Sequence, residues 1–231
     1  MCSCPPPEAV RNLLGRYWPD ESGNYNLEVF MIHWLGHASL RFDGSKVIYT
    51  DPWELKASEP KADIILITHE HFDHCSPPDV AKISKPTTVI VAPEDAAKKF
   101  KGPNVHTLKP GDTKIIDGVK IEAVHAYNTN KQFHPKANNW VGYIFTLDGK
   151  RIYQAGDTDL IPEMKDIKAD IVILPIGGTY TMTAAEAAEA VNIIGPKTAI
   201  PIHWGKIVGG KSDVETFKKL VKCEVMVLEM E

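Results

Sequence analysis

A strand-like apolar run that leads directly into a dense group of histidine and carboxylate side chains constrains this chain most. The run is DIILI at 63–67, and its β-branched residues predict a buried strand. The sequence THEHFDHC follows at 68–75 and places His69, His71, Asp73 and His74 within six residues. Because a turn after a strand holds polar groups on a rigid scaffold, we expect these side chains to form one site.

The residue types and their spacing indicate metal binding. Imidazole and carboxylate groups suit zinc, manganese or iron. An extended or tightly turned backbone can direct His69 and His71 at one ion, and Asp73 and His74 come one turn later, beside a second ion. The H-E-x-x-H helix of zinc proteases is absent because position 73 is Asp, so Glu70 is not expected to act as that family's general base. The alternative is a polar loop of solvated histidines, although ligand side chains this dense seldom serve packing.

Three further candidate ligands follow predicted strands. They are His125 after strand 121–124, Asp157 after strand 151–155, and His203 after strand 198–202. A carboxylate has two oxygens and can bridge two cations about 3.5–4 Å apart. Singly, each signal is weak, because a histidine after a strand is commonly structural and GDTD at 156–159 can be an Asx-capped turn. Their joint occurrence at strand ends favours a common site.

Strand and helix signals alternate in two groups, which predicts an α/β protein. The remaining strand-like runs lie at 29–34, 39–42, 46–50, 88–92 and 224–229. Asp-Gly pairs at 43–44, 117–118 and 148–149 predict antiparallel hairpins. Helices are predicted at 79–83, at 94–100, and after capping boxes beginning at Thr183 and Ser212.

This order of elements predicts a four-layer αββα sandwich, with strands packed on each other and helices on the outer faces. No linker or low-complexity segment divides the chain, so residues 29–231 are expected to form one domain. Residues 1–28 are expected to form an N-terminal extension packed on the core, with a short helix at 9–17.

Composition narrows the function classes. The chain has 231 residues, 43% of them hydrophobic, and a net charge of −4 without a basic stripe, which disfavours nucleic-acid binding. No apolar run reaches the roughly 18 residues of a membrane helix, and the N-terminus lacks an apolar signal core, so we predict a cytoplasmic protein. The four cysteines are too few for a disulfide framework: Cys2, Cys4, Cys75 and Cys223. Cys75 either lines the site or, as we favour, is a small buried apolar residue.

The order HxHxDH (69–74), His125, GDTD (156–159) and PIHW (201–204) resembles the metallo-β-lactamase superfamily. Four further strings resemble its compact metal-dependent hydrolases, related to ascorbate-6-phosphate lactonase and the N-acyl-phosphatidylethanolamine phosphodiesterases. These are WLGHAS (34–39), TDP (50–52), FHPKANNWVGY (133–143) and LPIGGTYTM (174–182). The resemblance runs from about Val29 to the C-terminus and implies the metallo-β-lactamase fold.

The resemblance also implies a binuclear site for two divalent metal ions, with zinc expected first and manganese or iron as alternatives. The implied ligands are His69, His71 and His125 for one ion, Asp73, His74 and His203 for the other, and Asp157 between them. Asp51 would orient a ligand from outside the coordination shell. Trp204 stands where tyrosine is more usual in this branch, which leaves the polarity of the pocket open.

We therefore predict a hydrolase that uses a metal-bridging hydroxide to cleave a small ester, lactone or phosphodiester. Asp73 is expected to hold the nucleophile and shuttle its proton. His37, His134 and Trp204 are candidate substrate contacts. Beside His134, the lysines at 131 and 136 either attract an anionic substrate or are simply solvated.

Two alternative functions remain. One is a metal-binding protein that keeps the fold without catalysis. The other is a nuclease of the same superfamily, which needs an added arm or domain to hold RNA, and the sequence shows no basic insertion of that kind. The expected partner is a small molecule, nucleic acid is not expected, and an oligomer is compatible with the sequence. His33 and His106 are interpreted as structural.

Overall fold

The computed structural model describes residues 16–19, 25–28 and 30–231. In the N-terminal part, β1 (Arg16–Pro19) and β2 (Tyr25–Glu28) pair antiparallel. The helix predicted at 9–17 is therefore wrong at positions 16 and 17, and its remainder lies outside the described residues, as do Cys2 and Cys4. The packing of this extension on the core stays a prediction.

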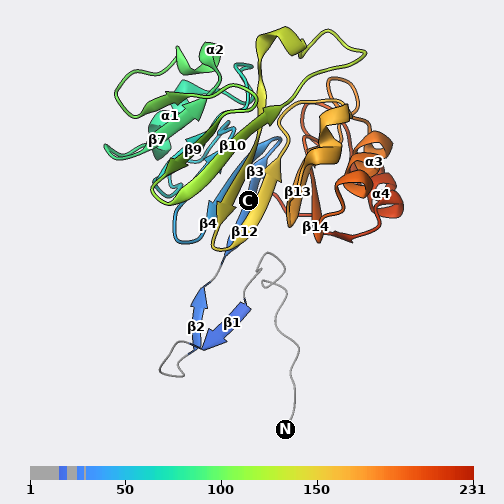
Figure 1. The fold of residues 1–231 in the computed structure, drawn as a ribbon, viewed down its shortest axis with the longest axis horizontal. Helices are drawn as coiled ribbons and strands as arrows, with labels where there is room; N and C mark the ends of the chain where they lie inside the picture. Colours follow the sequence, from blue (N-terminus) through green and yellow to red (C-terminus); the bar gives the residue numbers. More distant parts are fainter. Residues whose placement is uncertain (1–15, 20–24, 29) are drawn as a thin grey trace.

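Two mixed β-sheets pack face to face and carry helices on their outer faces (Figure 1). The six-stranded sheet has the spatial order β3 (Met31–Gly36), β4 (Ser39–Asp43), β5 (Ile48–Thr50), β6 (Ile64–Leu66), β7 (Val89–Ala92) and β8 (Val105–Thr107). The seven-stranded sheet has the order β15 (Glu224–Val225), β14 (Thr198–Ile202), β13 (Ile171–Pro175), β12 (Lys150–Gln154), β11 (Val141–Leu147), β10 (Val119–His125) and β9 (Thr113–Ile116).

The helices complete the outer layers. In chain order they are α1 (Pro77–Ile83), α2 (Glu94–Ala97), the 3₁₀ helices η2 (Lys136–Asn138) and η3 (Pro162–Asp166), α3 (Ala184–Ile194) and α4 (Lys211–Leu220). In Figure 1, α1 and α2 lie on one side of the paired sheets, and α3 and α4 lie on the other. The predicted four-layer αββα sandwich is confirmed. No helix within the described residues is long and apolar enough to cross a membrane.

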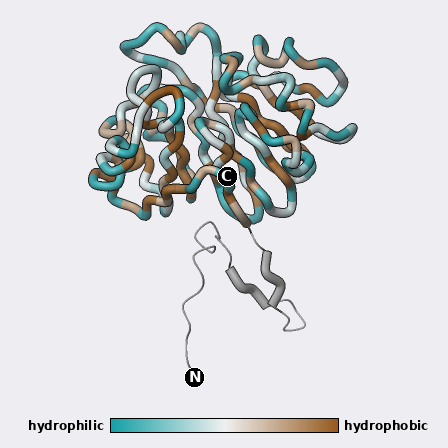
Figure 2. The backbone as a smooth tube through the Cα atoms, turned by 180° about the vertical axis from the view of Figure 1, so that it is seen from behind, coloured by the Kyte–Doolittle hydropathy of each residue, from teal (hydrophilic) through white to brown (hydrophobic). Residues whose placement is uncertain are grey.

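Three apolar clusters hold the layers together. The largest lies between the sheets, where the rings of Phe42 and Phe145 meet nearly at right angles with centroids 5.1 Å apart. A second cluster contains Val191 and Phe217 and joins the seven-stranded sheet to α3 and α4. The third cluster includes Ile83 and fills the space beneath α1 and α2. Figure 2 shows the same pattern, with hydrophobic segments concentrated along the strands and hydrophilic ones in the loops.

The predicted hairpins are confirmed, and two of them have the expected turn geometry. Asp117-Gly118 and Asp148-Gly149 each connect antiparallel strands through two residues, and all four residues have positive φ. A type I′ turn requires that conformation at both central positions, which explains the Asp-Gly sequence. The hairpin near Asp43 has a longer loop, because Phe42 pairs with Ile48.

One of the two predicted capping boxes is present. The Thr183 side chain accepts from the Glu186 N–H, and Glu186 accepts from the Thr183 N–H at 2.8 Å, so α3 begins as predicted. The second box was placed two residues too late. Helix α4 begins after Gly210, whose N–H donates to the Asp213 carboxylate at 2.8 Å, and this leaves Ser212 inside the helix.

His33 links three separated parts of the chain and yields a test of this packing. Its Nε2 lies 3.0 Å from Asp43 of β4, and its Nδ1 contacts Glu231 near the edge of β3. The nearby Asp43 carboxylate, the largest influence, raises the pKa of His33 in spite of burial. A folded-state pKa above the unfolded value of about 6.5 stabilises the fold fully below that pH, and the stabilisation is lost as pH rises through the folded pKa.

We therefore expect the difference in free energy of unfolding between wild type and His33→Asn to be larger at about pH 5.5 than at about pH 8.5. Urea unfolding at both pH values measures this difference. His106→Asn is the control: burial lowers the pKa of His106, so the corresponding difference should change in the opposite direction. A pH-independent difference for His33 would contradict the ion-pair assignment.

Candidate metal centre

Loops from both sheets meet at one edge of the sandwich and carry the predicted site residues. They are the β3–β4 turn at 36–38, the segment 68–75 after β6, the loop 126–140 after β10, the segment 155–159 after β12, and residue 203 after β14. Backbone hydrogen bonds join them: the His203 N–H donates to the His37 carbonyl at 2.9 Å, and the Val141 N–H donates to the Thr68 carbonyl at 3.1 Å. Parallel strands bring their carboxyl ends to a common edge, which explains the convergence.

Gly156 allows one of these close approaches. Its φ is +64°, and a Cβ built on it would lie 2.9 Å from the Thr68 Cβ and 2.9 Å from the Val141 carbonyl oxygen. Any larger residue would push apart the two segments that carry His69 and Asp157. The glycine of GDTD is therefore required by packing.

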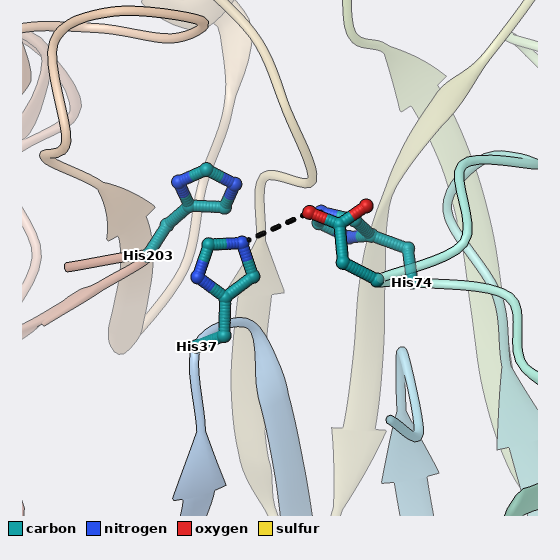
Figure 3. A group of neighbouring side chains, drawn as sticks. His37, His74 and His203 are labelled. Atoms are coloured by element: carbon teal, nitrogen blue, oxygen red, sulfur yellow. Dashed lines mark hydrogen bonds and ion pairs between the residues drawn. The ribbon is translucent and has the colours of Figure 1, made fainter. Parts of the chain in front are cut away.

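The described residues contain three groups of side chains whose ligand atoms all lie within 4.8 Å of one another. One of them, formed by His69, His74 and Asp157, joins the other two, which share no residue. One of these two groups consists of His69, His71 and His134. The other consists of His37, Asp73, His74 and His203. In Figure 3, His37, His74 and His203 approach one another from three separate segments of the chain.

Asp157 contacts both groups. Its Oδ2 lies 3.3 Å from His134 Nε2 and 3.2 Å from His203 Nε2, and its Oδ1 lies 3.4 Å from His74 Nε2. The side chain is only 5% exposed. A single buried carboxylate therefore stands between the two sets of imidazoles, as the sequence suggested for a bridging residue.

The residues fit a divalent cation, because their polar atoms converge without satisfying one another. Within the described chain, the Nε2 atoms of His74, His134 and His203 and the Oδ1 of Asp157 are buried and have no hydrogen-bond partner. Each such atom costs about 1–3 kcal/mol unless something binds its lone pair. A metal ion is the group that accepts several nitrogen and oxygen lone pairs at once.

Asp51 fixes the imidazole tautomers. Its carboxylate accepts from the Thr68 N–H at 2.8 Å, from the Thr68 hydroxyl at 2.8 Å, and from His74 Nδ1 at 2.8 Å. Because the Thr68 hydroxyl donates to Asp51, its oxygen accepts from His69 Nδ1, 2.9 Å away. Both histidines thus carry their proton on Nδ1 and present Nε2 to the site.

Asn128 has the corresponding role for His134. Its Oδ1 accepts from the His134 N–H at 2.9 Å and from His134 Nδ1 at 3.1 Å. The Asn128 amide in turn donates to the Asp159 carboxylate at 3.0 Å. These contacts hold the loop after β10 and leave His134 Nε2 facing Asp157.

Burial and charge act in opposite directions on the ionisable groups. Burial lowers the pKa values of His69 and His71. His74 differs, because Asp157 and Asp51 outweigh burial and raise its pKa well above the ordinary value. For Asp157, His203 and His74 outweigh burial and hold the carboxyl pKa well below its usual range. His69 and His71 therefore resist protonation, and Asp157 keeps a negative charge beside them, a combination that favours a cation.

Three residues of this region have left-handed backbone conformations that non-glycine residues seldom adopt. They are His37 with φ +50°, Asp51 with φ +46°, and His203 with φ +59°. Such conformations cost about 1–3 kcal/mol each and persist where surrounding contacts enforce them. Their concentration around one cluster is typical of a functional site.

The structure departs from the predicted ligand grouping at His125. Although it is described, it belongs to neither group, and its ring lies 6.1 Å from that of Tyr127 at the end of β10. His134, predicted to contact the substrate, lies with His69 and His71 instead. The reason is the fold of the loop after β10, where the Asn128 N–H donates to the His134 carbonyl at 2.8 Å and returns the chain to the site.

His37 and Trp204, predicted as substrate contacts, lie away from the cavity over the two groups. His37 is buried, its Nε2 lies 3.1 Å from Asp73 Oδ2, and its ring centroid lies 3.8 Å from that of His203 (Figure 3). The Trp204 indole N–H donates to the Pro201 carbonyl, and its ring packs on Trp34. Both line a separate cavity.

A cavity of about 310 Å³ opens over the two groups. Its walls are His71, Phe72, Asp73, Phe133, His134, Asp157, Tyr180, His203 and Ile207.

Lys131 and Lys136 pair with acidic residues, Asp159 at 2.7 Å and Glu163 at 2.8 Å. Cys75 is buried in the cluster beneath α1, as favoured from sequence, and burial raises its thiol pKa to about 12.

Residues 31–203 match the family model described as "Beta-lactamase superfamily domain". A UPF0173 metal-dependent hydrolase of Thermococcus onnurineus is 38% identical over 217 residues, which cover 86% of this chain and 96% of the relative. The chain belongs to the UPF0173 family of the β-lactamase superfamily. Another UPF0173 metal-dependent hydrolase, from Thermoplasma acidophilum, is 36% identical and covers 84% of the chain and 92% of its own length.

Two solved structures share the fold of this chain. A Parabacteroides distasonis protein, described as a metal-dependent hydrolase, superposes with a TM-score of 0.79 at 38% identity and covers 95% of this chain and 100% of its own. A Thermotoga maritima protein is described as a Zn-dependent hydrolase of the metallo-β-lactamase superfamily and superposes with a TM-score of 0.61. The match covers 87% of this chain and 98% of that protein. At 23% identity it shows the fold alone. The predicted superfamily and fold are thus confirmed.

The role of Asp51 can be separated from simple packing by a matched pair of variants. Asp79 is also a buried carboxylate, and it accepts from the backbone of Glu54 and Leu55 and from Lys82, but it lies outside the site. Asp51→Asn should weaken zinc binding about 10–100-fold, because the amide no longer fixes the tautomers of His69 and His74. Asp79→Asn should lower stability without changing zinc affinity.

Competition with a chromophoric chelator measures zinc affinity, and urea unfolding of each variant measures stability. Equal zinc affinities for Asp51→Asn and Asp79→Asn would show that Asp51 acts on folding alone.

Proposed function

We propose that this UPF0173 protein is a binuclear metal-dependent hydrolase of a small ester, lactone or phosphodiester. The observation that carries the proposal is the position of Asp157, a buried carboxylate in contact with imidazoles of both ligand groups. A carboxylate with a purely structural role would need contacts with only one of the two groups. Asp157 instead contacts Nε2 atoms of both ligand groups, a position that suits a residue shared by two cations.

In this proposal His69, His71 and His134 would hold one ion. Asp73, His74 and His203 would hold the other, and Asp157 would contribute to both. When bound, divalent ions would acidify water to a nucleophile near neutral pH and polarise the oxygen of the bond to be cleaved. The nitrogen and oxygen donors favour zinc, with manganese or iron as alternatives.

Asp73 is the residue we assign to proton transfer. It lines the cavity, its side chain is 13% exposed, and one of its oxygens is held by His37 Nε2 at 3.1 Å. Although burial opposes ionisation, the hydrogen bond from His37 lowers the pKa of Asp73. A fixed carboxylate at the cavity wall is suited to orient the nucleophile and accept its proton. His37 acts through Asp73 and is a positioning residue.

Metal content discriminates between His134 and His125 as the third histidine beside His69 and His71. Elemental analysis of protein purified without chelator should give about two equivalents of metal per chain. His134→Ala should lose about one equivalent after dialysis, because the site of His69 and His71 then lacks its third nitrogen. The matched variant His125→Ala should keep wild-type content. Loss of metal in His125→Ala, with full content in His134→Ala, would restore the grouping implied by the sequence.

Turnover tests the hydrolase assignment itself. Zinc-loaded protein should hydrolyse at least one of p-nitrophenyl acetate, δ-valerolactone and bis(p-nitrophenyl) phosphate. Asp73→Asn should lower kcat about 10²–10⁴-fold, the range for loss of a general acid or base. Asp170→Asn, at an ion pair with Lys197 outside the site, is the control. Bound metal without any turnover would instead identify a non-catalytic metal-binding protein.

A further inference from the structure

Four apolar side chains from four separate loops surround the opening above the ligand groups. They are Phe72, Phe133, Tyr180 and Ile207, which we call the apolar rim. Phe72 is 69% exposed, Phe133 is 46% exposed and Ile207 is 40% exposed. Large apolar residues at such exposure gain little from folding, so their gathering around one cavity needs an explanation.

Two members of the rim lie on segments that carry ligands. Phe72 lies between His71 and Asp73, and Phe133 precedes His134 in the chain. The Phe133 ring packs edge-on against Tyr180, with centroids 4.7 Å apart and planes at 87°. These three aromatic side chains therefore stay close to the ligand groups.

The charge around the opening favours an uncharged occupant. No lysine or arginine of the described chain is among the residues that line the cavity. Lys131, which the sequence offered as an attractor of anions, is bound to Asp159 at 2.7 Å. Away from the ligand groups, the residues that line the cavity are therefore aromatic and aliphatic.

We propose that the apolar rim binds an uncharged alkyl, acyl or aryl group of the substrate while the bond to be cleaved lies against Asp157. The substrates would then be esters, lactones or phosphodiesters that carry an apolar group of about four to eight carbons, a size compatible with a cavity of about 310 Å³. This inference rests on the proposed function, since the ligand groups must hold metal for the reactive end to bind there.

Binding of phosphonates tests the rim without relying on turnover. Methyl-, butyl- and hexylphosphonate share one metal-binding head and differ only in apolar length. Calorimetry on zinc-loaded protein should show affinity rising by up to about fourfold per methylene buried, and at least about tenfold from methyl to hexyl. Affinity that is independent of chain length would overturn the inference.

Two matched variants locate the effect. Ile207→Ser should flatten the dependence on chain length and leave methylphosphonate affinity unchanged. Ile193→Ser removes the same side chain at similar exposure, 46%, from α3, and should keep the wild-type dependence. Phe133→Ser should act like Ile207→Ser, whereas Phe72 is left intact because it adjoins two ligands. If affinity rose equally with alkyl chain length in wild type, Ile207→Ser and Phe133→Ser, the assignment of the rim as the binding surface would be overturned.

A metal-independent measurement separates failure of the rim from failure of the metal site. Fluorescence of 1-anilinonaphthalene-8-sulfonate on metal-free protein should fall in Ile207→Ser and Phe133→Ser but not in Ile193→Ser. If the protein binds no zinc, the proposed function fails and this result alone decides whether the rim binds apolar groups. If methylphosphonate binds and hexylphosphonate binds no better, the metal site stands and the rim inference fails.

A monomer–dimer equilibrium abolished by Ile207→Ser would show that the rim contacts a second copy of the chain. That result would also overturn the rim inference.

Discussion

The buried contact between Asp157 and three imidazoles is the constraint on which the rest of this structure depends. A carboxylate with 5% exposure carries a large desolvation cost, which only closely placed partners offset. Those partners come from the six-stranded sheet, through His74, from the seven-stranded sheet, through His203, and from the loop that carries His134. The site can therefore exist only if the two sheets pack in one relative position.

Hydrogen bonds across the sheet interface fix that position. The Tyr143 hydroxyl on β11 donates to the Ile67 carbonyl at the end of β6, at 2.9 Å. Gln154 on β12 donates to Asp51 at 3.3 Å, so the carboxylate that orients His74 is itself held from the opposite sheet. The apolar core between the sheets supplies most of the stability, but it is tolerant of small shifts, whereas these directional contacts are not. We infer that the core holds the layers together and the polar contacts set the register of the site.

The sequence predicted the parts of the site that depend on strands, and failed where a long loop decides. His69, Asp157 and His203 each follow a strand by one to three residues, so strand and turn signals were enough to predict that they lie at one edge. His134 lies nine residues beyond the end of β10. Its position depends on hydrogen bonds that His134 donates to the Asn128 side chain, and no short-range sequence pattern connects these two residues. The same limit applies to α4, where glycine and aspartate, weaker signals than Ser212, begin the helix.

The proposed ligands and the apolar rim differ in how firmly the fold constrains them. Hydrogen bonds to Thr68, Asp51 and Asn128 hold His69, His74 and His134 in place, so these ligand side chains are constrained by their neighbours. Phe133, Tyr180 and Ile207 stand on the loops and contribute no ligand atom, and the fold has no need of them as partly exposed residues. Substitutions there can change the surface that meets the substrate while the cluster stays intact. We therefore expect the ligand groups to carry the chemistry of the bond and the apolar rim to carry the selectivity for the substrate.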